Sequence, residues 1–94
     1  MPEAGAKWSI AVHREAKREL RRLPRHILQS ALESIRALAG DPYPAGSSKL
    51  TGHESLYRIR VGDWRIVYEV DSTTRTVTVL RVASRGEAYR DLWP

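Results

Sequence analysis

The chain has 94 residues, and its sixteen Lys and Arg residues against eleven Asp and Glu residues give a formal net charge of +5. This length accommodates one domain, residues 1–94, with a single modest core. The sequence contains no cysteine, which excludes disulfides, a thiolate nucleophile and a cysteine-ligated metal site, and its positive charge favours nucleic acid, an acidic protein or an anionic surface as partner.

Neither a metal site nor a membrane segment is expected. His13, His26 and His53 are scattered without the spacing of metal ligands, so we expect no metal and no other cofactor. His53 could be a titrating base, but a lone loop histidine is more often a surface residue. No apolar run approaches the roughly 20 residues of a membrane span, and residues 1–7 lack the basic start and apolar middle of a signal peptide. We therefore expect a cytoplasmic protein without a membrane partner.

The first half of the sequence predicts one short strand followed by two helices. Residues 8–12 form the strand, with apolar side chains on one side. Apolar residues then recur at helical spacing over about residues 14–23 and again from Pro24 to Ala39, and basic side chains cover the outside of the first helix. Pro24 ends the first helix and suits the first turn of the next, while Gly40 is a natural C-terminal cap. Two antiparallel helices joined tightly are expected.

Residues 56–70 predict a β-hairpin. The runs 56–61 and 64–70 both alternate apolar with polar residues. Gly62-Asp63 between them is typical of a two-residue turn with glycine first. Such a turn pairs Val61 with Trp64 and thereby fixes the register of the whole hairpin.

Three arginines share the polar face of this hairpin. The register sets Arg60 directly across from Arg65, with Arg58 beside Val67. Facing like charges are unfavourable, and a fold tolerates them most readily where an anion, such as a phosphate or a partner's carboxylate, lies between them. An arginine-rich strand face is also often only the solvated side of a half-buried sheet. The hairpin alone therefore leaves anion binding and simple solvation open.

The remaining segments complete the predicted order. Residues 45–48 are expected to form a flexible loop, and the β-branched run 76–82 a central strand after the turn at 71–75. Residues 83–94 are compatible with a short terminal helix packed on the sheet. The order βααβββ predicts an α+β fold, in which two antiparallel helices pack on one face of a small antiparallel sheet. The other face would carry the arginines.

Two residues after the last predicted strand extend this surface. Arg85 lies where its side chain can reach over the sheet edge, and Tyr89 follows four residues later, on the same face if the segment is helical. A guanidinium on a phosphate and a tyrosine ring against a base suit an unpaired nucleotide, although Tyr89 is equally consistent with a core aromatic. One register through the 71–75 turn would place Arg81 across from Arg65. Three further basic residues are predicted to contact the substrate: Lys49, Arg81 and Arg90.

These residues together resemble the RelE/ParE superfamily of toxins from type II toxin–antitoxin modules. The resemblance rests on Lys49-Leu-x-Gly, Tyr57-Arg-Ile-Arg-Val-Gly-Asp-Trp-Arg-Ile-Val-Tyr68, Val77-x-Val-Leu-Arg-Val82 and Arg85-x-x-x-Tyr89-Arg90, with the Leu23-Pro24 break and the Asp41-Pro42 exit. It spans nearly the whole chain. The RelE branch comprises ribosome-dependent mRNA endonucleases, whereas the ParE branch poisons DNA gyrase without nuclease chemistry.

The RelE pattern implies five catalytic positions. It has two basic residues in the strand that Tyr57 opens, an arginine in the next strand, an arginine after the last strand and a tyrosine near the C-terminus. This sequence fills them with Arg58, Arg60, Arg65, Arg85 and Tyr89. The family often has lysines at the first two positions, and its arginine-to-tyrosine spacing is longer. Ala83-Ser84 replaces the Gly-His-like step of another nuclease branch.

The resemblance implies a metal-free reaction and two partners. The 2′-OH would attack the adjacent phosphate, giving a 2′,3′-cyclic phosphate and a free 5′-OH. The substrate would be mRNA in the ribosomal A site, and the protein partner a small, acidic, co-encoded antitoxin. Occupancy of all five positions favours this endoribonuclease over the alternative, a ParE-like gyrase inhibitor without nuclease activity. A basic RNA-binding module without turnover is a third interpretation.

Overall fold

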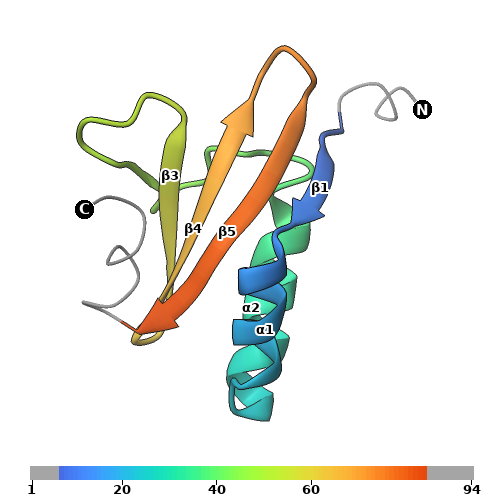
Figure 1. Ribbon diagram of the computed structural model, residues 1–94, viewed down its shortest axis with the longest axis vertical. Coiled ribbons are helices and arrows are strands. Elements are labelled where there is room, and N and C mark those ends of the chain that lie inside the picture. Colours follow the sequence, from blue (N-terminus) through green and yellow to red (C-terminus); the bar gives the residue numbers. More distant parts are fainter. Residues whose placement is uncertain (1–6, 85–94) are drawn as a thin grey trace.

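The computed structural model describes residues 7–84, which form two helices and five strands (Figure 1). In chain order these are β1 (Ser9–Val12), α1 (Arg14–Arg21), α2 (Arg25–Ala37), β2 (Ser48–Lys49), β3 (Leu56–Val61), β4 (Trp64–Asp71) and β5 (Thr76–Ser84). The expected α+β class and order of elements are confirmed, with β2 as an additional short strand. The expected terminal helix lies outside the described residues.

The five strands form one sheet in the order β1-β5-β4-β3-β2. The pairs from β2 to β5 are antiparallel, as expected. β1 instead pairs in parallel with β5, so the sheet is mixed rather than wholly antiparallel. Ile10 lies across from Val77 and Val12 from Val79, which lets β1 add its apolar side chains to the same core.

The two helices lie together on one side of the sheet (Figure 1). α1 follows β1 with only His13 between them, and this residue bonds to the sheet through its backbone and caps the helix through its side chain. Its backbone N–H donates to the Val79 carbonyl at 2.8 Å, and its Nδ1 accepts the N–H of Glu15 at 3.2 Å as an N-cap. Pro24 precedes α2 with a φ of −56°, which suits the start of a helix. His13 therefore has a structural role where the strand meets the helix.

The main core lies between the helices and the sheet. Tyr68 is its largest fully buried side chain, and its hydroxyl donates to the Pro42 carbonyl at 2.8 Å. Burial of the phenol raises the pKa of Tyr68 to about 12. The Tyr57 ring stacks on Tyr68 with centroids 6.0 Å apart, and Tyr43 meets Tyr57 edge-on at 5.1 Å. These contacts tie the segment after α2 to the base of the hairpin.

A β-bulge interrupts the pairing of β4 with β5. Tyr68 pairs with Val79, whereas the preceding residue Val67 pairs with Arg81, so Leu80 is an extra residue on β5. Beyond the bulge Val82 again faces the helices, where it is buried. Within residues 7–84, no helix is long and apolar enough to cross a membrane.

Candidate functional site

The hairpin that carries the candidate site has the predicted register. Val61 pairs with Trp64 and Arg60 with Arg65. Gly62, the first turn residue, has a φ of +61°. Asp63, the second turn residue, has no positive φ, since Arg75 is the sole non-glycine residue with a positive φ within residues 7–84. Positive φ at the first turn residue alone identifies a type II′ turn, whose twist suits a tight hairpin. Local turn chemistry therefore brings two of the predicted catalytic arginines together.

Arg58, Arg60 and Arg65 form what we call the arginine face. Because the two-residue turn makes Val61–Trp64 a hydrogen-bonded pair, Arg60–Arg65 is a non-hydrogen-bonded pair, with Cα atoms about 4.5 Å apart. Arg60 is exposed, and Arg58 and Arg65 are partly buried. Arg65 Nη1 donates to the carbonyl oxygen of Trp64 at 3.3 Å, which occupies one of five guanidinium donors. The arrangement concentrates positive charge where an anion can bridge two strands.

A small apolar cluster lies beneath this face. It contains the buried residues Leu50, Val67 and Ala83, with Leu56 packed against them. Val67 pairs with Arg58 and Ala83 with Arg65, so the cluster shares the face of these arginines. Guanidinium groups beside a water-excluded surface interact more strongly with an anion than guanidinium groups in bulk water. The arginine face therefore lies beside buried apolar side chains.

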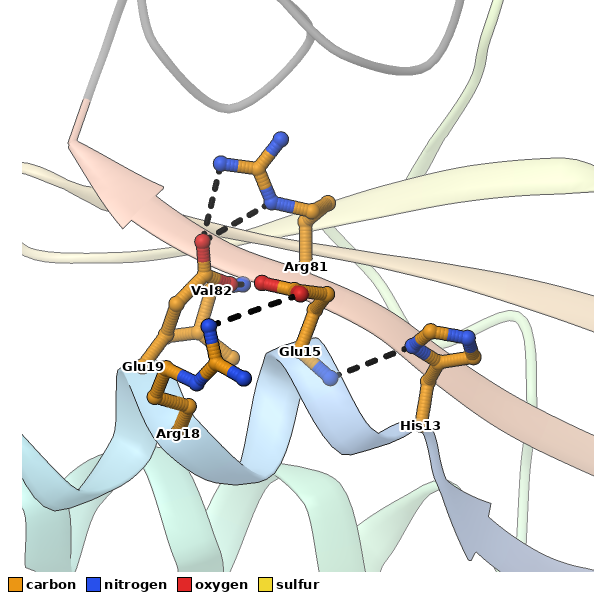
Figure 2. Close-up of polar contacts among 6 residues, drawn as sticks. All are labelled: His13, Glu15, Arg18, Glu19, Arg81 and Val82. Atoms are coloured by element: carbon orange, nitrogen blue, oxygen red, sulfur yellow. Dashed lines mark hydrogen bonds and ion pairs between the residues drawn. The ribbon is translucent and has the colours of Figure 1, made fainter.

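Arg81 lies on the same side of the sheet as the arginine face, but not at the predicted position. The expected position across from Arg65 is wrong, because Arg65 pairs with Ala83 and Arg81 with Val67. The Arg81 guanidinium instead reaches Glu19 of α1, with Nε and Nη2 each 2.8 Å from Oε2 (Figure 2). This ion pair gives Arg81 a partner within the protein, so its predicted contact with substrate finds no support.

Lys49 is also separated from the arginine face. It pairs with Tyr57, whose ring packs on the main core, so Lys49 lies on the helix side of the sheet. It is exposed there, at the start of the loop that leads to the hairpin. The remaining predicted site residues, Arg85, Tyr89 and Arg90, lie outside the described residues.

Sequence reasoning missed the role of Glu19. The contact with Arg81 joins residues 62 positions apart, and no local pattern links them. Glu15 and Glu19 have the spacing of ordinary solvated charges on a helix. Within residues 7–84 no cluster of three or more His, Asp or Glu side chains is arranged to hold a metal ion.

A comparison with known families accounts for this architecture. The family model described as the ParE toxin of the type II toxin–antitoxin system parDE matches residues 10–89. The chain belongs to the RelE/ParE superfamily of toxins. The resemblance drawn from the motifs is therefore confirmed.

Individual relatives place this toxin on the RelE side of the superfamily. Toxin RelE of Mycobacterium tuberculosis is 31% identical over 84 residues, which cover 88% of this chain and 87% of the relative. Toxin RelG of the same organism is 32% identical over 84 residues, covering 88% and 97%. The archaeal RelE–RelB complex from Pyrococcus horikoshii superposes with a TM-score of 0.77 at 29% identity, covering 87% of this chain and 99% of that chain. The chain is thus a RelE-like type II toxin.

Proposed function

We propose that this toxin is a ribosome-dependent mRNA endoribonuclease that cuts message in the A site. The observation that carries the proposal is the arginine face, in which Arg60 and Arg65 stand directly opposite each other above an apolar cluster. Like charges on facing strands fit a site that closes around a phosphate. The names of the curated relatives, RelE and RelG, support the same branch.

Five residues are proposed to carry the reaction: Arg58, Arg60, Arg65, Arg85 and Tyr89. The 2′-oxygen attacks the adjacent phosphorus and loses its proton, the P–O5′ bond breaks, and the leaving 5′-oxygen takes up a proton. The cyclic phosphate and the 5′-hydroxyl are the products. Arginines rarely exchange protons, because the guanidinium group keeps its charge in proteins, so they act by stabilising negative charge on the pentavalent phosphate. For Tyr89 we propose a ring that stacks on a base and a hydroxyl that takes part in the reaction.

Dependence on the ribosome follows from this set of side chains. Arginine and tyrosine are reluctant bases near neutral pH, so much of the rate must come from holding the 2′-oxygen in line with the P–O5′ bond. Correct alignment can contribute about 7–11 kcal/mol to lowering a barrier. A message held in the A site is already constrained, whereas free RNA is not.

The experiment compares naked mRNA with the same mRNA under translation. Purified toxin should leave naked mRNA largely intact and cut translated message at the A site, and the new ends should carry a 2′,3′-cyclic phosphate and a 5′-hydroxyl. Efficient cutting of naked RNA would contradict the ribosome dependence. The matched family model carries the ParE name, so DNA breaks that disappear in a gyrase-resistant host would favour gyrase inhibition instead.

We also propose a small, acidic, co-encoded antitoxin as partner and the cytoplasm as the site of action. The net charge of +5 favours an acidic partner. The related toxin from Pyrococcus horikoshii was crystallised with RelB. Co-expression of the neighbouring acidic reading frame should restore growth and slow amide exchange over residues 24–39 or 58–90. Unchanged exchange over both ranges would show that the antitoxin binds elsewhere.

A further inference from the structure

At the free edge of β5, the carboxylate of Glu19 accepts a backbone N–H that a neighbouring strand would otherwise bond. β1 covers only the first part of β5, from Thr76 to Val79. Beyond this point the N–H of Val82 points away from β4, and Glu19 Oε1 accepts it at 2.6 Å. Glu19 Oε2 at the same time accepts Nε and Nη2 of Arg81 (Figure 2). We call these three interactions the Glu19 contact.

The Glu19 contact differs from an ordinary surface ion pair, and α1 itself provides the comparison. The side chains of Arg81 and Glu19 are 13% and 18% exposed. Nε and Nη2 of Arg81 both lie 2.8 Å from Oε2 of Glu19. Arg18 and Glu15 are 51% and 52% exposed and 3.7 Å apart. Short, charge-assisted and shielded bonds hold geometry, whereas an exposed pair at that distance contributes little.

Two consequences follow for the neighbouring site. Val82 lies two residues before Ser84, the last residue of β5, and Arg85 is the next residue along the chain. Fixing the Val82 N–H to α1 therefore holds the last residues of β5, to which Arg85 is joined, in place. Arg81 shares the arginine-face side of the sheet through its pairing with Val67, but its charge is compensated by Glu19.

We propose that Glu19 is a positioning residue of this toxin. It sets the end of β5 from which Arg85 follows, and it withholds the charge of Arg81 from bound RNA. The first half of this statement rests on the proposed cleavage of mRNA, and the second half stands independently of it. Neither role requires Glu19 to touch substrate.

The test compares Glu19→Gln with the matched control Glu15→Gln, which removes the same charge from the same helix. Glutamine keeps an acceptor for the Val82 N–H but loses the ion pair with Arg81. Glu19→Ala loses both interactions, so in single-turnover cleavage on translating ribosomes it should lower the saturating rate about 10- to 100-fold, as misplacement of a reacting group does, whereas Glu19→Gln should stay close to the wild type. The half-saturating concentration of Glu19→Ala should be unchanged or lower. Glu15→Gln should match the wild type in both values.

Binding to a single-stranded DNA oligonucleotide, which cannot be cut by 2′-OH attack, tests the withheld charge. Releasing one arginine should make the plot of log K against log salt concentration steeper by about 0.7 for Glu19→Gln. The Glu19→Gln/Arg81→Gln double variant should return to the wild-type slope, and Glu15→Gln should retain it. An unchanged slope for Glu19→Gln would overturn the withholding role.

The remaining outcomes separate positioning from stability and from the proposed function. Parallel losses in rate, affinity and melting temperature in Glu19→Ala would make Glu19 merely structural, and a wild-type cleavage rate for Glu19→Ala would overturn positioning. Exchange of the Val82 amide should be about tenfold faster in Glu19→Ala, the factor that a lost hydrogen bond of about 1.4 kcal/mol produces. If the wild type cuts no message, the proposed nuclease function fails, while the salt slope and the Val82 exchange still decide on the Glu19 contact.

Discussion

Replacing Arg65 with alanine should slow cleavage of ribosome-bound mRNA about 100- to 1,000-fold, which is the usual effect of removing one group that stabilises a developing oxyanion. Arg65 is the residue to change because it pairs with Arg60 and lies on the neighbouring strand to Arg58. It is therefore the central member of the arginine face. The substitution removes a charge without leaving a large cavity, since the Arg65 side chain is only partly buried.

The same substitution should change stability little, because two small effects oppose each other. The bond from Arg65 to the Trp64 carbonyl is long, at 3.3 Å, and a hydrogen bond of this kind contributes at most about 0.5–1.5 kcal/mol. Removing the repulsion with Arg60 should return about 0.2–1 kcal/mol. The net change should stay within about 1 kcal/mol, which corresponds to a shift in melting temperature of at most about 4–8 °C.

The assay combines cleavage on translating ribosomes with thermal melting for each variant. Arg36→Ala is the control, because Arg36 is an exposed residue in the last turn of α2 and carries the same charge. This control should cut at the wild-type rate. Wild-type cutting by Arg65→Ala would refute the proposed site, and loss of cutting together with a large fall in melting temperature would show that Arg65 is structural.

Three further predictions concern single residues. The pKa of Tyr68 is raised from 10.0 to about 12 in the folded protein. The neutral phenol therefore stabilises the fold fully below pH 10, and about 2–3 kcal/mol of the free energy of unfolding is lost as the pH rises to 12. Urea unfolding of Tyr68→Phe should lack this alkaline loss, and an identical loss in both proteins would contradict the raised pKa of Tyr68. Gly62→Ala should destabilise the hairpin by about 1–3 kcal/mol through backbone strain alone, because a Cβ at this φ of +61° meets no atom within 4 Å; an unchanged urea midpoint would argue against the type II′ turn. Tyr89→Phe keeps the ring for base stacking, so it should bind RNA normally and cut more slowly, and full activity would remove the hydroxyl from the mechanism.

The hairpin could be predicted from the sequence because its determinants are local. A two-residue turn permits only one register between the two strands, and that register brings Arg60 and Arg65 together. The positions of the helices could also be predicted from the sequence, since Pro24 and the spacing of apolar residues mark the boundary between α1 and α2. These features depend on neighbours within a few residues.

The features that escaped sequence reasoning depend on distant residues. The four residues between β4 and β5 allow several registers, and the extra residue Leu80 changes the pairing again within β5. Arg81 was consequently misplaced. β2 has only two residues, too few for a periodic pattern, and its pairing placed Lys49 on the unexpected face. The partnership of Glu19 with Arg81 leaves no trace in either segment alone.

The parallel pairing of β1 with β5 constrains the order of events during synthesis. Ser9 pairs with Thr76, so the strand made first cannot find its partner until the ribosome has added 67 further residues. The antiparallel hairpins form from segments that emerge together, whereas β1 closes a long loop whose entropy must be overcome. Until β1 pairs with β5, the side chains of Ile10 and Val12 cannot pack into the main core. The sheet of the nascent toxin is therefore completed at its N-terminal strand only after its arginine-bearing hairpin has been made.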